Sequence, residues 1–302
     1  MLDNEKTVIA LGLFDSVHKG HKKVIESALF RAKELNAKCV VVTFDADVKS
    51  KLSLNMQGSI FPLAERINRI ESLGVDSVYA LTTSKEFLSL TPNEFLDYIN
   101  EKFSVLEYFC GEDYTFGFKA QGNAKTLQEY AEKKGQKASV IPLEKLNGEK
   151  ISSSNIKSFL KEGKVCLANQ MLTKDYSISG VVIEGRKVGR TIGFPTINLK
   201  CDLENKLLKN GVYEGYTFIN GNKYKCIINY GIIPSFNIDK VWLEAHILGI
   251  DENLYGKQVE IYFTNFIRDI IKFESVLELK KQLEKDLQKV AKWLSLGQVA
   301  TR

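Results

Sequence analysis

A short loop with glycines near its two ends, residues 12–21, constrains this chain more than any other stretch. It follows an apolar run, residues 8–11, that predicts a buried strand. After the loop, apolar residues recur at the spacing of an amphipathic helix: Val24, Ile25, Ala28, Leu29, Ala32 and Leu35. The sequence therefore predicts a strand, a tight turn and a helix start in direct succession.

The side chains of this loop suit an anion. Free backbone N–H groups, the positive end of the helix dipole and the cationic Lys19 converge at such a helix start. The spacing of His18 and His21 places both rings on one side of a helix that begins at or before His18. Two histidines there could stabilise charge on a phosphoryl group. The alternative is an ordinary solvated loop, but two of the three histidines of the chain fall within these four positions.

Composition predicts a soluble two-domain protein. The chain has 302 residues, 44% hydrophobic and 26% charged, and no apolar run is long enough to span a membrane. Its polar start is unlike a secretory signal, so we expect a cytoplasmic protein. The five cysteines form no CxxC pair, which predicts reduced thiols rather than disulfides or zinc ligands. A net charge of +5 fits small anionic substrates and gives little support to nucleic-acid binding.

Strand and helix patterns alternate through the first half of the chain. Residues 39–44 and 75–81 predict buried strands, and residues 63–73 predict a helix between them. Thr91 and Pro92 predict the start of a further helix, as its N-cap and first residue. We expect a doubly wound, Rossmann-like parallel sheet with helices on both faces and ligands at the carboxyl ends of its strands.

Two later segments of this half are candidates for further binding loops. Residues 111–123 follow a predicted strand and contain three glycines and two acids, although a plain turn-rich connection explains them equally well. Residues 151–157 place three serines at the start of a predicted helix, with Lys157 one turn later. Capping explains one serine, and a second phosphate-binding helix start explains all three.

The second half predicts a small antiparallel β-barrel. From Tyr176 onward, β-branched and aromatic runs are separated by glycines, and Asn220-Gly221 is a strong hairpin signal. The strand runs are residues 177–183, 211–219, 222–230, 241–248 and 258–266. A final helix follows Ser275, which forms a capping-box pattern with Glu278.

Two constellations in this half predict chemistry. Residues 185–199 join glycines and basic residues to a rigid Pro-Thr-x-Asn turn, where Thr196 and Asn198 could supply oxygens to Mg²⁺. A long hairpin connection is the alternative. Strand alternation puts Glu244 and His246 on one face, and a carboxylate beside a phosphate site could accept a proton from an attacking hydroxyl. By itself, Glu244 reads more simply as an exposed strand residue.

These segments together resemble one family. Residues 12–21 are similar to the HxGH signature of the α/β nucleotidyltransferase superfamily, in the longer form G-x-F-D-x-V-H-x-G-H of its flavin branch. Residues 111–122 and 151–157 resemble further motifs of that branch, and residues 189–199 resemble the riboflavin kinase signature. The chain is thus identified as a member of the bacterial bifunctional riboflavin kinase/FMN adenylyltransferase (FAD synthetase) family, with motifs in family order.

The resemblance implies an adenylyltransferase domain over residues 1–172 and a riboflavin kinase barrel with a C-terminal helix over residues 173–302. It implies catalytic roles for His18, His21 and Glu244, the last as the base, and Mg²⁺ binding at Thr196 and Asn198. It implies nucleotide or phosphate contacts at Gly12, Phe14, Asp15, Gly20, Asp113, Ser152, Ser153, Ser154, Lys157, Gly189, Arg190, Gly193 and Pro195.

The implied reactions are phosphorylation of riboflavin by ATP to FMN and adenylylation of FMN by a second ATP to FAD. The implied partners are small molecules, without nucleic acid or membrane, for a monomer or weak homo-oligomer. The sequence departs from the family pattern at Ser16, where glycine is usual, at Lys157, where arginine is usual, and at Ile232-Ile233, where a polar element is usual.

Three other functions stay open. An adenylyltransferase for another acceptor, such as nicotinamide mononucleotide or phosphopantetheine, would share the first loop, but residues 185–199 argue against it. An FMN adenylyltransferase with a weakened or non-catalytic flavin-binding kinase domain would fit Ile232-Ile233. An RNA-binding barrel would be expected to show basic and aromatic clustering, which the sequence lacks.

Overall fold

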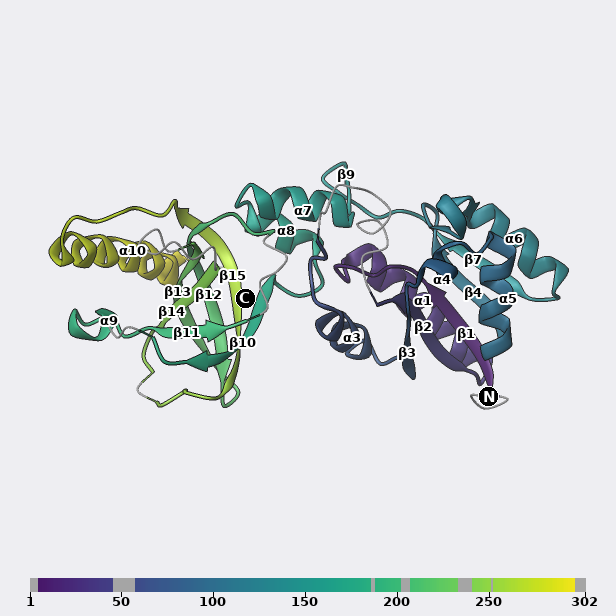
Figure 1. Ribbon diagram of the computed structural model, residues 1–302, viewed down its shortest axis with the longest axis horizontal. Helices are drawn as coiled ribbons and strands as arrows, with labels where there is room; N and C mark the ends of the chain where they lie inside the picture. Colours follow the sequence, from purple (N-terminus) through teal and green to yellow (C-terminus); the bar gives the residue numbers. More distant parts are fainter. Residues whose placement is uncertain are drawn as a thin grey trace. The chain divides into compact units, whose positions relative to one another are not determined.

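The structure is a computed structural model, and it describes residues 5–45, 58–185, 188–201, 207–232, 241–250 and 252–296. The chain divides into two compact units (Figure 1). The first comprises Met1–Ile156 with Met171–Thr173, and the second comprises Lys157–Gln170 with Lys174–Arg302. The domain boundary after residue 172 that the resemblance implies stays a prediction.

The first unit contains the expected parallel sheet. Within the described residues it has five strands in the order β3-β2-β1-β4-β7, and every pairing is parallel. Its strands are β1 (Lys6–Leu11), β2 (Lys38–Phe44), β3 (Ser77–Leu81), β4 (Ser104–Gly111) and β7 (Lys137–Ile141). Its helices are α1 (Lys19–Glu34), α3 (Leu63–Glu71), α4 (Lys85–Leu88), α5 (Pro92–Lys102) and α6 (Ala124–Lys133).

The central strand β1 is buried on both faces. Val8 and Ala10 pack in one core with the apolar side of α1. Ile9 and Leu11 pack in a second core with apolar residues of α5 and α6. This double burial explains why β1 reads as a continuous apolar run, and it places the loop after β1 at the carboxyl edge of the sheet.

Short elements connect the larger ones. A hairpin of β5 (Thr115–Phe116) and β6 (Gly122–Asn123) flanks the 3₁₀-helix η1 (Phe118–Ala120). A second hairpin pairs β8 (Lys145–Leu146) with β9 (Glu149–Lys150). Two helices follow it, α7 (Ser153–Lys161) and α8 (Val165–Met171).

The second unit contains the expected barrel with one strand more than the sequence pattern predicted. In the described part of the chain the closed barrel has the order β10-β11-β14-β13-β12-β15, and all its pairings are antiparallel. Its strands are β10 (Ser177–Ile183), β11 (Ile197–Lys200), β12 (Gly211–Ile219), β13 (Asn222–Ile232), β14 (Val241–Ile247) and β15 (Gln258–Arg268). A one-turn helix, α9 (Val188–Thr191), precedes β11.

The prediction of a Pro-Thr-x-Asn turn was therefore wrong in part. Asn198 lies on strand β11, which follows Pro195 and Thr196 directly. Four residues are too short for a strand pattern to stand out from a turn. The Asn220-Gly221 hairpin is confirmed, and both residues have the positive φ angles, 51° and 80°, that its tight turn requires.

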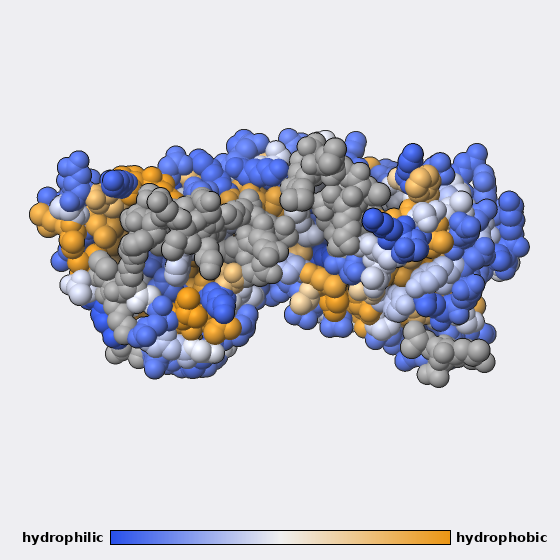
Figure 2. Space-filling model, viewed as in Figure 1, coloured by the Kyte–Doolittle hydropathy of each residue, from blue (hydrophilic) through white to orange (hydrophobic). Residues whose placement is uncertain are grey.

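The last helix, α10 (Val276–Leu296), packs on the outside of the barrel. Val290 and Leu287 contact a small apolar cluster that includes Val212 and Ile227. Arg268 on β15 forms an ion pair with the buried carboxylate of Asp286 on α10, at 2.8 Å. Figure 2 shows apolar surface near the start of this helix, where Val276 and Leu277 are exposed.

The Arg268–Asp286 pair should anchor α10. Asp286 is 0% exposed, so its replacement by alanine leaves the Arg268 charge buried without this partner. We expect Asp286→Ala to lower the free energy of unfolding by about 3 kcal/mol in urea denaturation followed by circular dichroism. Glu284→Ala, at an exposed carboxylate on the same helix, is the control. Equal denaturation midpoints for the two variants would contradict this role.

Candidate active sites

His18 is the N-cap of α1, and it positions His21. The His18 Nδ1 atom accepts a hydrogen bond from the His21 backbone N–H at 3.0 Å. The two rings are stacked, with centroids 3.5 Å apart and an angle of 17° between the ring planes. Because Nδ1 is an acceptor, the neutral His18 ring carries its proton on Nε2. The prediction that both rings lie together at a helix start is confirmed.

Burial keeps the two histidines neutral. It lowers the pKa of His18 to about 4, although nearby Asp113 works in the opposite direction. Burial also holds the pKa of His21 well below its ordinary value, and the neighbouring His18 adds to this effect. The His21 Nδ1 atom is buried and has no hydrogen-bond partner among the described residues. Both rings therefore offer neutral polar atoms, rather than permanent positive charge, to a bound phosphate.

Two glycines allow this packing. A β-carbon at Gly12 would lie 2.7 Å from the ring of Phe14, which is buried and meets His21 edge-on. A β-carbon at Gly20 would lie 3.2 Å from the His18 ring. Either β-carbon would crowd the aromatic ring that it met. Both glycines therefore support the geometry of the histidines.

Ser16 fits the loop, although glycine is usual at its position. The left-handed residues of the loop are Phe14 and Val17, with φ angles of 47° and 45°, and Ser16 is not one of them. Its side chain is fully buried, and its Oγ lies 3.1 Å from the Oγ of Ser153 at the start of α7. The serine thus connects the first loop with the predicted phosphate-binding helix start.

The serines before and in α7 have different surroundings. Ser152 Oγ accepts a hydrogen bond from the Asn155 backbone N–H at 3.3 Å, which is a capping contact. Ser153 faces Ser16, whereas Ser154 is exposed. Lys157, four residues after Ser153 on the same helix, is only 8% exposed. Capping therefore accounts for one of the three serines.

Asp15 and Asp113 lie in unlike environments. Asp15 is 1% exposed, and its Oδ1 accepts a hydrogen bond from the Ile60 backbone N–H at 2.8 Å. This contact holds the loop against residue 60, and a nucleotide contact for Asp15 stays a prediction. Asp113 is exposed and forms an ion pair with Lys150, at 2.6 Å between Nζ and Oδ2. The hairpin of Lys150 follows Glu144, whose β-carbon would lie 3.9 Å from a β-carbon at Gly20 of the first loop, and the charges of both partners act on His18.

Sequence reasoning missed three residues around this loop. Lys150 belongs to a short hairpin without a motif of its own. Arg66 on α3 and Thr43 on β2 both donate hydrogen bonds to the Leu13 carbonyl, at 3.0 Å and 2.8 Å. Arg66 is almost fully buried, although arginine side chains are mostly exposed. No sequence signal marked these residues, because their contacts join segments far apart in the chain.

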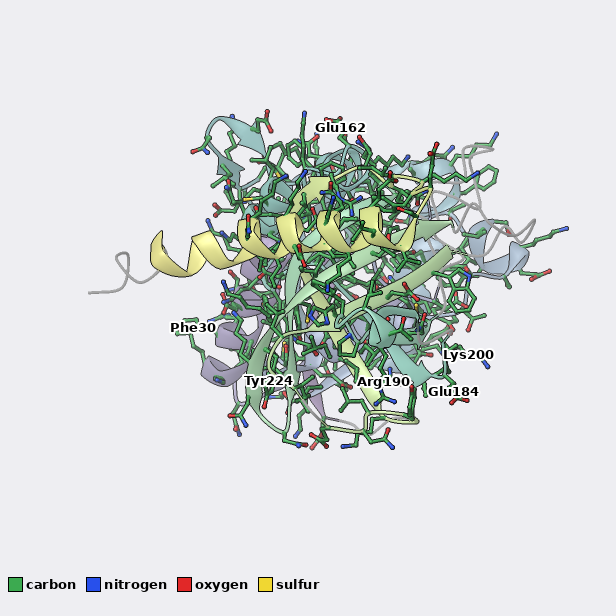
Figure 3. All side chains as sticks on the ribbon, turned by 90° about the vertical axis from the view of Figure 1, so that its left-hand side faces the viewer. Phe30, Glu162, Glu184, Arg190, Lys200 and Tyr224 are labelled. Atoms are coloured by element: carbon green, nitrogen blue, oxygen red, sulfur yellow. The ribbon has the colours of Figure 1, made fainter. Side chains whose placement is uncertain are left out.

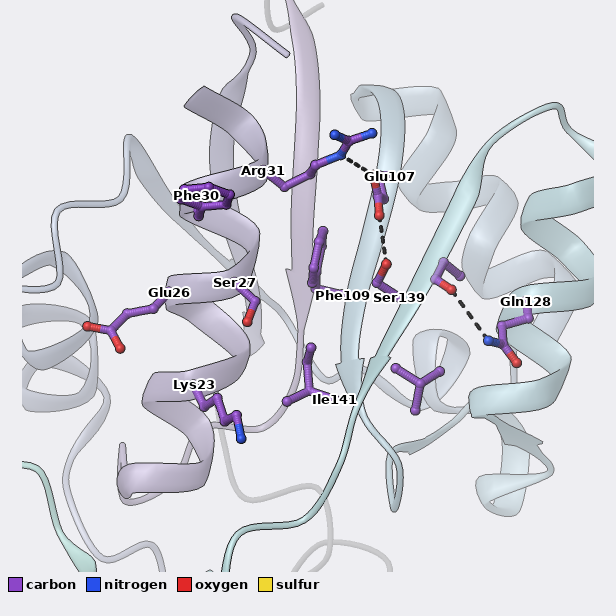
Figure 4. Close-up of a pocket in the computed structure, with 12 residues that line it drawn as sticks. Lys23, Glu26, Ser27, Phe30, Arg31, Glu107, Phe109, Gln128, Ser139 and Ile141 are labelled. Atoms are coloured by element: carbon purple, nitrogen blue, oxygen red, sulfur yellow. Dashed lines mark hydrogen bonds and ion pairs between the residues drawn. The ribbon is translucent and has the colours of Figure 1, made fainter. Parts of the chain in front are cut away.

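An open groove of about 830 Å³ lies elsewhere on the first unit, between α1, β4, β7 and α6 (Figure 4). Arg31 donates to Glu107 at 2.8 Å, and Glu107 accepts from Ser139 at 2.7 Å, which forms a polar chain across it. Phe30 at its rim is 65% exposed. The groove is lined by none of the site residues predicted from the sequence.

The second candidate site is a polar row across three adjacent barrel strands. Asn198 on β11 pairs in register with Glu244 on β14, and Glu244 pairs with Asn229 on β13. Side chains at paired positions of antiparallel strands lie on the same face of the sheet. Leu243 and Ala245 are fully buried, whereas Glu244 and His246 are half-buried. The predicted alternation along this strand is confirmed.

Two contacts fix the segment before β11. His246 Nδ1 forms a hydrogen bond with the Pro195 carbonyl oxygen at 2.7 Å, and its ring packs against buried Phe194. A β-carbon at Gly185 would lie 1.9 Å from the Asn198 side-chain nitrogen. The Asn198 side chain therefore lies directly on the backbone of Gly185, a close approach that only glycine permits. His246 was predicted only to share the face of Glu244, and it is a further positioning residue.

The glycines around α9 shape the connection to β11. A β-carbon at Gly189 would lie 2.2 Å from the Phe194 carbonyl oxygen, and the Phe194 N–H donates to the Gly189 carbonyl at 2.8 Å. Gly193 has a φ angle of +86° and closes the turn after α9. Arg190 on this helix is exposed (Figure 3). Residues 186–187 and 233, together with the Ile232 side chain, lie outside the described residues, so the Ile232-Ile233 departure stays untested.

The oxygens at the second site suit a hard cation. The Asn198 amide lies opposite Glu244 across the strand pair, and the Thr196 hydroxyl lies two residues before Asn198 in the chain. Both offer neutral oxygens, and Mg²⁺ prefers oxygen ligands together with substrate phosphates. Among the residues that the structure describes, no group of three or more His, Cys, Asp or Glu side chains could hold a metal ion. A Mg²⁺ site here would therefore draw on Thr196, Asn198 and the phosphates of a nucleotide.

No helix in the described part of the chain is both long and apolar enough to cross a membrane.

Comparisons with known proteins match the two halves of the chain to two family models. Residues 1–155 match a family model described as FAD synthetase, and residues 172–294 match one described as riboflavin kinase. A bifunctional riboflavin kinase/FMN adenylyltransferase of Bacillus subtilis is 35% identical over 97% of this chain and 94% of its own length. One from Buchnera aphidicola subsp. Acyrthosiphon pisum is 36% identical over 97% of this chain and 95% of its own length.

A solved structure shares the whole fold. The crystal structure of a Streptococcus pneumoniae protein described as a macrolide-efflux protein has a TM-score of 0.87 and 30% identity. The match covers 96% of this chain and 95% of that one. With the two family models in sequence and curated relatives along nearly the entire length, the chain belongs to the bifunctional riboflavin kinase/FMN adenylyltransferase family.

Proposed function

We propose that the chain is an enzyme of flavin cofactor synthesis that phosphorylates riboflavin to FMN and adenylylates FMN to FAD. The observation that carries the proposal is the presence, on one chain of this family, of both a stacked histidine pair at a helix start and an Asn198–Glu244 row in a barrel. An adenylyltransferase with a non-catalytic barrel is less well supported, because the polar row of the barrel is intact.

The first site serves adenylyl transfer. A phosphate oxygen of FMN attacks the α-phosphorus of ATP, and the bond from this phosphorus to the oxygen of the leaving pyrophosphate breaks. His18 Nδ1 is engaged by the His21 backbone, so its Nε2–H is the group that can donate to a phosphate oxygen. Gly12, Phe14 and Gly20 hold the rings in place. Positioning and hydrogen bonding suffice, and no covalent enzyme intermediate is required.

The helix start at α7 supplies further phosphate contacts at this site. Free N–H groups and the positive end of the helix dipole favour an anion. Ser153 is oriented by Ser16, and Ser152 caps the helix. Ser154 and Lys157 complete the predicted element, and Lys157 adds a positive charge without the planar fork of arginine. Asp15 holds the first loop in place by accepting a hydrogen bond from the backbone N–H of residue 60.

The second site serves riboflavin phosphorylation. Glu244 accepts the proton of the riboflavin 5′-hydroxyl as that oxygen attacks the γ-phosphorus of ATP, and ADP leaves. Asn198 and Thr196 would hold Mg²⁺, and a bound Mg²⁺ would offset negative charge on the phosphates. His246 fixes Pro195, and thereby the backbone that presents Thr196. Gly189, Arg190 and Gly193 form the glycine-rich, basic connection that admits the ATP phosphates.

The proposal also covers the location, the substrates and the oligomeric state of the protein. The chain acts in the cytoplasm on riboflavin, FMN and ATP, as a monomer or weak homo-oligomer. It has no nucleic-acid partner, in keeping with a mild net charge of +5 that is spread along the sequence.

Replacement of His21 should separate the two activities. His21→Ala removes a ring that lies at the first site, so we expect FAD formation from FMN and ATP to fall by about 10²-fold or more. Riboflavin phosphorylation should stay unchanged. Lys22→Ala, at the next position of α1, is the control. Separation of riboflavin, FMN and FAD by their fluorescence measures both steps, and unchanged FAD formation would refute the role of the loop.

Replacement of Glu244 should have the converse effect. Glu244→Gln keeps the shape of the side chain but removes the base, so FMN formation should fall by about 10²-fold or more. FAD formation from supplied FMN should be spared. Glu214→Gln, at a partly buried glutamate of the same barrel, is the matched control. Loss of both activities would show that Glu244 is a structural residue instead.

The buried His18 should make the stability of the protein depend on pH. The ordinary pKa is 6.5 and the folded pKa is about 4, so the unfolded chain takes up a proton that folded His18 does not. The free energy of unfolding should therefore decrease as the pH is lowered below 6.5, and at pH 5 it should be about 2 kcal/mol smaller than at neutral pH. His18→Asn keeps an N-cap without this titration. Urea denaturation at pH 7 and pH 5 should show a smaller loss in the variant, and equal losses would contradict the assignment.

A further inference from the structure

Lys150 is held in place by the hairpin that carries it. Its carbonyl accepts a hydrogen bond from the Asn155 side-chain amide in α7 at 2.9 Å. The next residue, Ile151, is buried and donates its N–H to the Glu144 carbonyl at 2.9 Å. Glu144 in turn forms an ion pair with Lys23 of α1. The backbone of Lys150 is therefore tied to the two helices whose starts form the first site.

The Lys150 side chain extends to the second loop of the same site. Its Nζ lies 2.6 Å from Asp113 Oδ2, while 39% of the side chain stays exposed. An ammonium group has three N–H donors, and this contact engages one of them. Two N–H groups can therefore meet a ligand without loss of the ion pair. The residue before this hairpin, Glu144, lies against the first loop, because a β-carbon at Gly20 would lie 3.9 Å from the Glu144 β-carbon. The charges of Lys150 and Asp113 both act on His18, in opposite directions.

The first site needs a positive charge that its two histidines do not supply. Both histidines are neutral, so they supply hydrogen bonds but little charge to a triphosphate. During the reaction, the bond between the α-phosphorus and its bridging oxygen breaks, and the electron pair passes to pyrophosphate. A charge-assisted hydrogen bond to that leaving group is stronger than a neutral one. An isolated surface ion pair, by contrast, contributes little to stability.

We propose that Lys150 is a substrate-contacting residue of the adenylylation site, where Asp113 holds its ammonium group against the phosphate oxygens that leave as pyrophosphate. The inference rests on the proposed function of the first site and adds a residue to it. It also gives Asp113 a positioning role, because a carboxylate facing a triphosphate would otherwise repel it.

The hairpin offers a matched control for the test. Lys145 lies directly opposite Lys150 in the β8–β9 register and is also exposed. We expect Lys150→Ala to lower kcat/KM for ATP in FAD formation by about 10-fold or more, a loss of the size expected for one charge-assisted contact. Lys150→Arg should retain most of the activity, and Lys145→Ala should stay within about twofold. Binding of inorganic pyrophosphate, measured by calorimetry, should weaken in Lys150→Ala alone.

Asp113→Asn tests the positioning role. If Asp113 acts through Lys150, this substitution should lower activity in the wild-type background and have almost no effect when Lys150→Ala is already present. Additive losses would overturn that role. Lys150→Ala with the same kcat/KM and pyrophosphate affinity as Lys145→Ala would overturn the substrate contact.

Wild-type activity separates this inference from the proposed function. A wild-type protein that forms no FAD from FMN and ATP would overturn both. Wild-type FAD formation together with a fully active Lys150→Ala variant would overturn the inference alone. Riboflavin phosphorylation by every variant shows that the chain is folded.

Discussion

The hydrogen bond from the His21 backbone N–H to His18 Nδ1 is the contact on which the first site depends. It begins α1, selects the protonated nitrogen of His18 and brings the two rings into a stack. Gly20 leaves room for the first ring, and the Arg66 and Thr43 contacts to Leu13 hold the preceding turn. A helix cap thereby becomes part of a catalytic geometry, because the capping side chain is itself a functional group.

In the barrel, the register of the strands aligns the side chains of the second site, as the helix cap aligns the histidines in the first unit. Asn198, Glu244 and Asn229 come from three strands, and only the pairing of these strands aligns them. A slip of one residue along β11 would turn Asn198 to the other face of the sheet. The approach of Asn198 to Gly185 and the bond from His246 to Pro195 oppose such a slip. The site is therefore placed by elements that also close the barrel.

Sequence patterns predicted those features of the fold that depend on residues close together in the chain. The strand-to-helix order, the helix starts and the Asn220-Gly221 hairpin follow from periodicity, capping and turn preferences, and the resemblance supplied the family. The patterns missed β11 because four residues give too little periodicity. They also missed the Lys150–Asp113 pair and the Ser16–Ser153 contact, which join positions 37 and 137 residues apart. Such contacts depend on the fold, and a single sequence carries no local signal for them.

At the first site, the buried histidines supply a fixed geometry, and other groups must supply the positive charge. Rings kept neutral by burial can be packed tightly, since no unpaired charge is buried with them. The charge that a triphosphate needs must then come from groups that stay near water. Lys150 meets this condition because Asp113 holds it and much of its side chain remains exposed. Exposure weakens an ion pair, but at Lys150 it also leaves N–H groups of the ammonium that can donate to a phosphate.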